Sequence, residues 1–324
     1  MKIKSLHIKN FKSIVDLTLT EPNPFTVFVG PNGAGKSNIF EALEYRLFSY
    51  KFGDLYKDLN SLFPNVFSYK PVIKGSLLSH MPAIEIRFDT FKILDLGMMI
   101  VRSGERKGAD DFFEFREDVN YYQFVDNHSE IFIKNKNREK VNLKGDNKLS
   151  TSCDNLEKVL KRILQDPDKK EEITDWLQLL IPEFENVEID AADRLKVKEK
   201  SHADAFEKDL ISDGTYNILA LLTAVYQSDE PQFLCIEEPE NGLNPYVVRK
   251  LVDFFRAACQ EKGHYIWLNT HSHDLVACLE PEEVVVVDKI GGETKIKQVK
   301  GMNLHGLDMA EVWLSGALGG GTPW

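Results

Sequence analysis

The spacing of apolar and polar residues first suggests an ordered α/β unit at the start of the chain. Spaced apolar positions from Ile3 to Phe11 predict a strand, and the apolar run Phe25 to Val29 predicts a short buried strand. Residues 38–48 have the spacing of a helix. A glycine-rich segment separates this helix from the buried strand, and strand, glycine loop and helix is the order that a phosphate-binding loop requires.

The middle of the chain has a different pattern. Short runs in which apolar and polar residues alternate predict meandering antiparallel strands at 83–88, 98–102, 112–115, 121–125 and 131–133. After Ser152 the spacing becomes helical, with one apolar face formed by Leu156, Val159, Leu160 and Ile163, and a second helix is expected over 172–180. No heptad repeat is sustained, which excludes a long coiled coil.

The last stretch, 201–324, returns to alternating helices and apolar strands. Helices are expected at 215–226 and 245–259, and strands at 233–236, 265–268 and 284–287. Continuous apolar strands between helices are typical of a parallel sheet that is covered on both faces. We therefore predict an α/β fold with a mixed sheet, in which 1–50 and 201–324 form one discontinuous core and 51–200 is an inserted β-meander plus helical lobe.

The glycine-rich segment Gly30 to Ser37 (GPNGAGKS) matches G-x-x-x-x-G-K-[ST] at every fixed position. Its glycines let backbone amides close around phosphates, Lys36 can reach the β and γ oxygens, and the Ser37 hydroxyl can bind Mg²⁺. A chance glycine-rich turn would not need a strand before it and a helix after it. Nucleotide contacts are expected from Asn32, Gly33, Ala34, Gly35, Lys36, Ser37 and Asn38.

The strand 233–236 ends on two adjacent carboxylates, Glu237 and Glu238. A buried strand that stops on paired acids is costly unless the acids have partners, and Mg²⁺ and water are the expected ones. Glu237 would bind the metal, and Glu238 would act as general base on the attacking water. A solvated turn is the alternative, which the phosphate-binding loop in the same chain disfavours.

Two further segments carry polar groups where ligands gather. His271 follows the strand 265–268, at the end where α/β sheets bind ligands, and is a candidate γ-phosphate sensor rather than a structural histidine. Ser212, Asp213 and Gly214 stand at the start of an apolar helix, as either an anion site or a simple N-cap. The residues alone leave these two interpretations of the helix start equally open.

Composition limits the classes of partner. The net charge is −11, so a nucleic-acid surface is possible but not favoured, although 134–144 and 194–200 are locally basic. The chain lacks an apolar run of the roughly 20 residues that span a membrane, and its start does not resemble a secretory signal. Four scattered cysteines indicate reduced thiols rather than a disulfide or zinc framework. These features predict a cytoplasmic protein without membrane contact.

Together the motifs resemble the ABC-type ATPase heads of the SMC, RecF and OLD group, which are often classed among AAA-family ATP-binding proteins. MKIKSLHIKNFKSI looks like the opening strand of that group and GPNGAGKSN like its Walker A motif. LISDGTYNILALL resembles its degenerate signature, FLCIEEPENGLNP its Walker B motif and D-loop, and LNTHS its switch-histidine loop. The long stretch between Lys36 and Glu237, and LISDGT in place of LSGGQ, distinguish the chain from a transporter ATPase.

The resemblance implies a P-loop ATPase that uses ATP and Mg²⁺ and dimerises head to head around ATP. Ser212, Asp213 and Gly214 would then contact the γ-phosphate bound by a second protomer, with Asn241 and Asn244 in the D-loop at that interface. Further contacts by resemblance are Lys12 and Ser13, near the α-phosphate, where Lys replaces the commoner Arg. The Q-loop glutamine has no clear counterpart, and Gln123 is only a candidate.

The resemblance also limits the biological role. OLD nucleases continue after the ATPase into a nuclease domain, and the stretch from Met309 to Trp324 is not expected to hold one. The resemblance therefore favours an ATPase switch that controls a separate effector protein, in anti-phage or toxin-like defence. Trp313 and Trp324 are either partner anchors or part of a frayed tail. A DNA-repair ATPase that clamps DNA and a non-catalytic nucleotide-binding scaffold are the alternatives.

Overall fold

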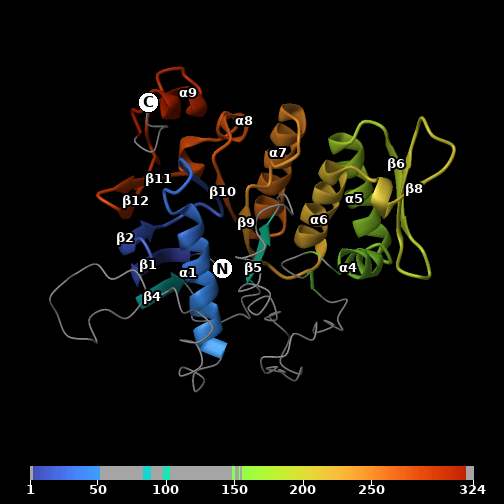
Figure 1. Cartoon of the computed structure of the whole chain (residues 1–324), viewed down its shortest axis with the longest axis horizontal. Coiled ribbons are helices and arrows are strands. Elements are labelled where there is room, and N and C mark those ends of the chain that lie inside the picture. Colours follow the sequence, from blue (N-terminus) through green and yellow to red (C-terminus); the bar gives the residue numbers. More distant parts are fainter. Residues whose placement is uncertain are drawn as a thin grey trace.

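The computed structural model describes residues 3–51, 83–88, 98–102, 148–149, 153 and 155–318 (Figure 1). Its elements up to the middle of the chain are β1 (Ile3–Phe11), β2 (Ile14–Thr20), β3 (Phe25–Val29), α1 (Lys36–Lys51), β4 (Ala83–Phe88), β5 (Met98–Arg102), α4 (Leu156–Ile163), α5 (Pro167–Leu180), β6 (Phe184–Ile189), β7 (Leu195–Glu199) and β8 (Phe206–Glu207). They continue with η2 (Lys208–Leu210), α6 (Asp213–Tyr226), β9 (Phe233–Glu237), α7 (Pro245–Glu261), β10 (Tyr265–Thr270), α8 (His273–Val276), η3 (Pro281–Glu283), β11 (Val284–Ile290), β12 (Glu293–Gln298) and α9 (Met309–Leu314).

A six-stranded mixed sheet with the order β12-β11-β3-β10-β9-β5 forms the centre of the molecule. Its neighbouring strands are parallel, apart from the antiparallel hairpin of β11 and β12. Strand β3 lies between β10 and β11, so segments from the first and last stretches of the chain share one sheet. Strands β3 and β10 are buried at every position, which explains why their sequences are continuously apolar rather than alternating.

The structure corrects the expected antiparallel meander at one strand. β5 lies at the edge of the central sheet and runs parallel to β9, with Met98 opposite Phe233. β4 is antiparallel, but its partner is β1, in a second sheet of order β2-β1-β4. An apolar pattern predicts a strand without specifying its partner, so the sequence alone places β4 and β5 in the inserted lobe. The strands expected at 112–115, 121–125 and 131–133, and Gln123, lie outside the described residues.

The central sheet separates two hydrophobic cores. Alternate residues along its strands face opposite sides, so Phe28, Cys235 and Trp267 pack with α1, β1 and β2. Their neighbours in sequence, such as Ile236 and Leu268, face the second core, which includes α4 to α9. Helices α1 and α6 therefore cover opposite faces of the sheet, and Figure 1 shows β9 and α7 between them.

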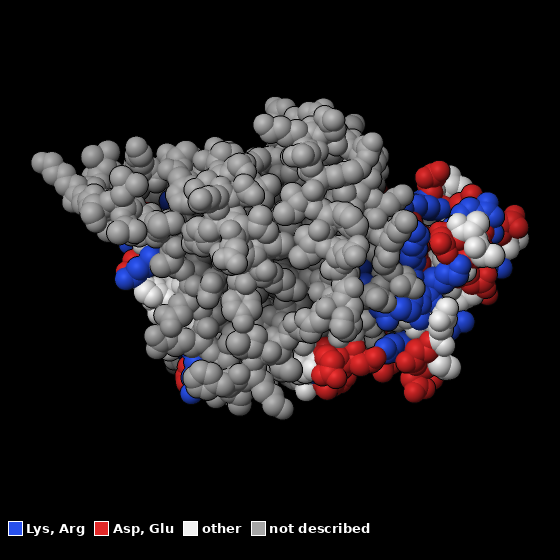
Figure 2. All heavy atoms as spheres, turned by 90° about the horizontal axis from the view of Figure 1, so that it is seen from below, with Lys and Arg blue, Asp and Glu red and all other residues white. Residues whose placement is uncertain are grey.

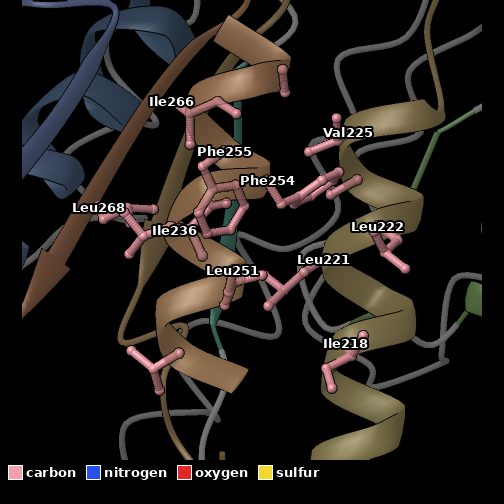
Figure 3. Close-up of a cluster of buried hydrophobic side chains, with 14 of the residues drawn as sticks. Ile218, Leu221, Leu222, Val225, Ile236, Leu251, Phe254, Phe255, Ile266 and Leu268 are labelled. Atoms are coloured by element: carbon pink, nitrogen blue, oxygen red, sulfur yellow. The ribbon is translucent and has the colours of Figure 1, made fainter. Parts of the chain in front are cut away.

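Figure 3 shows the larger core between α6, α7 and the sheet. Leu221 and Val225 on α6 point toward α7, whose Leu251, Phe254 and Phe255 lie between α6 and the sheet. On the outer side of α6 the expected apolar face of α4 is confirmed, since all four of its residues are buried. Full burial of a Leu or Phe side chain contributes about 1.5–3 kcal/mol, so this layer stabilises the position of α6 against the sheet.

Two other sequence predictions need adjustment. α5 begins at Pro167, five residues before its predicted start, because the Asp166 side chain accepts hydrogen bonds from the amides of Asp168 and Lys169 and Pro167 occupies the first turn.

Trp313 is not an exposed anchor: it is 1% exposed and packs against the His273 ring, with centroids 5.3 Å apart. Trp324 lies outside the described residues.

Within the ranges that the structure describes, no helix is both long and apolar enough to cross a membrane.

Candidate nucleotide site

The glycine-rich loop lies between the end of β3 and the first residue of α1. The Lys36 ammonium donates hydrogen bonds to the carbonyls of Gly30, at 2.7 Å, and Pro31, at 3.1 Å, so its own loop holds the side chain. Gly33 and Gly35 have φ angles of +80° and +102°, which only glycine adopts readily. The loop therefore has the wrapped backbone of a phosphate cradle, with Asn32 and Gly33 exposed at its tip.

Lys36 also connects the loop to the acidic end of β9. Its side chain is almost fully buried, and burial lowers the pKa of Lys36 below its ordinary value. The nearby carboxylates of Glu238, Glu240 and Glu237 oppose this effect by favouring the charged form. The predicted Walker A lysine and the predicted catalytic acids thus share one electrostatic environment, although 200 residues of sequence separate them.

Glu238 has an unusual backbone conformation. Its φ is +46°, in the left-handed region that costs a non-glycine residue of the order of 1–3 kcal/mol. The Glu238 amide donates to the backbone carbonyl of Asn269, at 3.0 Å, and to its side-chain oxygen, at 3.2 Å. Pro239 follows and disfavours helical geometry at Glu238. The strand therefore stops at this residue in a fixed, strained turn, which is a common feature of functional sites.

Both carboxylate oxygens of Glu238 are engaged by residues that the sequence singled out. Oε1 lies 2.9 Å from Nδ1 of His271, and Oε2 accepts a hydrogen bond from Nδ2 of Asn241 at 3.0 Å. Glu238 and His271 remain 33% and 43% exposed, so solvent reaches both side chains. The structure thus joins the predicted general base, the predicted sensor histidine and the D-loop in one cluster.

Glu240 is a third acid in this region, and sequence reasoning did not single it out. It is 8% exposed, and burial raises its pKa, although a hydrogen bond from the Thr270 hydroxyl to Oε1 acts in the opposite direction. This contact ties the loop after β9 to the end of β10, where His271 follows. Glu240 and Thr270 lie inside motifs that the sequence identified, but nothing in the sequence pairs them.

The arrangement suits a magnesium ion bound together with phosphate. Ser37 and Glu237 are both partly accessible, and Glu237 has a weak contact from Nδ2 of Asn269 at 3.4 Å. In the described part of the chain, no group of three or more His, Cys, Asp or Glu side chains could hold a metal alone. Mg²⁺ commonly takes one or two carboxylates and fills its remaining positions with phosphate oxygens and water, which fits this donor set.

The signature segment caps helix α6. The Ser212 hydroxyl accepts from the Thr215 amide at 3.1 Å, so Ser212 is the N-cap of α6, and Ser212 and Asp213 are exposed. A capping hydrogen bond is compatible with both interpretations of this helix start. A Cβ on Gly214 would lie 2.8 Å from the Gly242 carbonyl, so this helix start packs tightly on the D-loop. α6 packs in the core on one face of the sheet, whereas the phosphate loop packs in the core on the opposite face.

Asparagines extend this packing along the D-loop. Asn217 of α6 donates to the Asn241 carbonyl at 3.1 Å. Asn244 caps α7, where its side chain accepts from the Val247 amide at 3.0 Å. The signature helix is thereby connected to the same loop that holds Glu238.

Lys12 and Ser13 occupy the turn between β1 and β2. The Lys12 ammonium pairs with the Glu41 carboxylate on α1, so in this structure its charge is directed at that helix. Ser13 lies next to the phosphate loop, where its hydroxyl accepts from Nδ2 of Asn38 at 2.6 Å. The Ser13 hydroxyl is also 2.6 Å from that of Thr294, a residue that sequence reasoning did not identify.

The family comparison matches residues 25–277 to the model described as "AAA domain, putative AbiEii toxin, Type IV TA system". Among solved structures, an SMC head bound to the C-winged helix domain of ScpA is 14% identical, with a TM-score of 0.53 over 92% of this chain and 97% of that chain. At this identity the likeness shows the fold.

Among curated proteins, chromosome partition protein Smc of Methanocaldococcus jannaschii is 49% identical over 45 residues, which are 14% of this chain and 4% of that protein. DNA replication and repair protein RecF of Thermosynechococcus vestitus is 42% identical over 45 residues, which are 14% of this chain and 12% of RecF. The chain thus matches only a small part of these relatives. The family model nevertheless covers more than half of the chain, so the protein belongs to this AAA-domain family and has the fold of an ABC-type, SMC-like ATPase head.

Proposed function

We propose that this protein binds and hydrolyses ATP and uses the cycle to form and dissolve a homodimer that controls a partner protein. The observation that carries the proposal is the position of Glu238, held between His271 and Asn241 and in the same electrostatic environment as Lys36. A carboxylate fixed at this point beside a phosphate cradle is arranged to activate water for attack on a γ-phosphate.

Each residue would have a limited task in hydrolysis. Backbone amides of the loop would surround the phosphates, and the Lys36 ammonium would exchange its two carbonyl acceptors for phosphate oxygens. Ser37 and Glu237 would hold Mg²⁺, which supplies charge neutralisation when bound. Glu238 would take the proton from the attacking water, while His271 keeps the carboxylate oriented and can contact the γ-phosphate.

The location of the signature supports completion of the site by a second copy. Ser212 and Asp213 are exposed at the start of α6, on the other face of the sheet from the phosphate loop. Exposed amides and a hydroxyl at a helix start attract anions, and here they have no phosphate loop of their own chain to face. A head-to-head homodimer would bring each signature onto the ATP held by the partner.

The dimer can be tested with a charge placed at the signature. Ser212→Asp keeps an N-cap residue, so the stability of α6 should change by less than about 0.5 kcal/mol, but its carboxylate would repel a γ-phosphate. In a Glu238→Gln background with ATP, we expect Ser212→Asp to be monomeric by light scattering while the background variant is dimeric. Ser228→Asp, beyond the other end of α6, is the matched control and should leave the dimer intact. Equal dimer fractions in all three would contradict the proposed interface.

The kind of partner protein that the ATPase controls is also part of the proposal. The family description names a toxin of a toxin-antitoxin system, and the SMC head in the comparison is bound to a separate protein, ScpA. Both support an ATPase that acts through another polypeptide, and an effector in anti-phage or toxin-like defence is the form we favour. Co-purification with the product of an adjacent gene, dependent on ATP and lost in Lys36→Ala, would test this role.

A DNA clamp is the second candidate, because the curated relatives are named for chromosome partition and DNA repair. The charges at 194–200 weigh against it. Arg194 binds Asp190 through its backbone amide and guanidinium, which lowers the pKa of Asp190 to about 2, and Lys200 donates to the Pro182 carbonyl. Figure 2 shows basic and acidic side chains intermixed on the described part of one face.

A salt series separates these two functions. A clamp that neutralises several phosphates loses affinity steeply with salt, with a log–log slope of about −0.9 for each phosphate contacted. We expect duplex DNA to bind weakly and with a shallow slope, since the basic side chains near 194–200 already have acceptors. A steep slope that appears only with ATP would favour the DNA clamp over control of a partner protein. Absence of DNA binding at low salt would exclude the DNA clamp.

A further inference from the structure

Thr294 on β12 contacts the phosphate loop from a distant part of the sequence. It is fully buried, and its hydroxyl donates to the Ala34 carbonyl at 2.9 Å. The Thr294 backbone amide donates to the Ser13 carbonyl at 2.8 Å. The β11–β12 hairpin and the β1–β2 turn therefore meet on the loop between β3 and α1.

The donors and acceptors in this cluster run in one direction. Asn38 donates to the Ser13 hydroxyl, and the Thr294 hydroxyl donates its one proton to Ala34. The Ser13 proton is therefore the one that bridges the 2.6 Å between the two hydroxyls. Each hydroxyl donates once and accepts once, so the series of hydrogen bonds from Asn38 through the partly buried Ser13 to Ala34 is satisfied at every step. A satisfied hydrogen-bond network fixes geometry.

The last hydrogen bond of this series, from Thr294 to Ala34, determines the orientation of the Ala34–Gly35 peptide group. In a trans peptide the carbonyl and the following N–H point in opposite directions, so fixing the Ala34 carbonyl on Thr294 turns the Gly35 N–H away from β12. We propose that Thr294 is a positioning residue that orients the Ala34–Gly35 peptide so that its N–H faces the phosphates of the nucleotide. Gly35 fits this role, because a Cβ there would collide with the Thr294 hydroxyl.

This inference rests on the proposed ATP binding and is tested by removing one hydroxyl. Thr294→Val keeps the volume and removes the donor to Ala34, so we expect the Kd of a fluorescent ATP analogue and the KM for ATP to rise about tenfold, with kcat within about twofold. Thr294→Ser keeps the hydroxyl and should restore both constants to within about threefold of the parent.

Thr223→Val is the matched control. Thr223 is also fully buried and donates to a backbone carbonyl, that of Leu219 within α6, but it is remote from the phosphate loop. Its substitution should lower thermal stability about as much as Thr294→Val without changing the Kd. An unchanged Kd in Thr294→Val, or equal losses in both Val variants, would overturn the positioning role.

A second measurement does not depend on nucleotide. The Ala34 amide donates to Pro31, and the Asn38 amide donates to Gly35, so both should be protected in the free protein. We expect Thr294→Val to accelerate hydrogen exchange in peptides covering 31–38, and Thr223→Val to leave them unchanged. Failure of the parent to bind ATP would refute the proposed function, and the exchange rates would still decide the role of Thr294: equal rates in parent and Thr294→Val would overturn it.

Discussion

Replacing Glu238 with Gln is expected to slow ATP hydrolysis roughly 10²- to 10⁴-fold, the range that a positioned general base contributes. Gln has nearly the same shape, and its carbonyl can still accept the hydrogen bond that Asn241 donates to Oε2 at 3.0 Å. Its amide cannot take a proton from water. Binding of ATP should therefore survive while the chemical step fails.

The loss of hydrolysis in Glu238→Gln should also lengthen the lifetime of the dimer. If ATP holds two copies together and hydrolysis releases them, Glu238→Gln should prolong the ATP-bound dimer in proportion to the slower chemistry. Single-turnover hydrolysis and the dissociation rate of the dimer, measured on the same preparation, check both statements. We expect a stable ATP-dependent dimer in Glu238→Gln and only a transient one in the parent.

Substitutions of two other acids, one at the end of β9 and one before it, provide controls for Glu238→Gln. Glu237→Gln removes the expected metal ligand and should weaken Mg²⁺-dependent ATP binding, which Glu238→Gln leaves unchanged. Glu230→Gln changes an exposed acid before β9 and should have no effect on either step. Hydrolysis by Glu238→Gln at the parental rate would show that another group activates the water and would remove Glu238 as the base.

The phosphate loop and the acids could be predicted from the sequence because their chemistry depends on residues that are close together along the chain. Gly30 to Ser37 needs a strand before it and a helix after it, and both adjoin it in sequence as β3 and α1. Likewise β9 carries Glu237 at its end, where a run of apolar residues marks the buried strand. Adjacent residues encode these features, so a pattern can predict them.

Contacts between distant segments are not encoded in this way. Nothing near Thr294 signals that it meets Ser13, and nothing near Glu240 signals Thr270, because these pairs form only after the sheet brings separate loops together. The same limit explains the error at β5, whose partner β9 is far along the chain. The expectation for Trp313 is wrong for a related reason, because the burial of this aromatic side chain depends on α8, whose His273 packs against it.

Replacing Lys36 with Ala is the second change with a large expected effect, a loss of ATP affinity of at least about 100-fold. A charge-assisted contact to phosphate contributes roughly 1.5–3 kcal/mol, and Lys36 would contact two phosphates at a buried position. Its ammonium now bonds to the Gly30 and Pro31 carbonyls, so Ala would also release the loop from its own tether. Hydrolysis and ATP-dependent dimerisation should disappear together.

One further variant separates the charge of Lys36 from its volume, and a second variant is a surface control. Lys36→Met fills most of the same buried space without a charge, so it should fold at least as well as Lys36→Ala and lose ATP binding equally. Lys262→Ala removes a lysine that pairs with Glu172 on the surface, at 3.0 Å, and should bind ATP as the parent does. Calorimetric titration with ATP measures all three. Retained ATP affinity in Lys36→Met would mean that volume, not charge, holds the loop open for nucleotide, and the role assigned to the ammonium would be wrong.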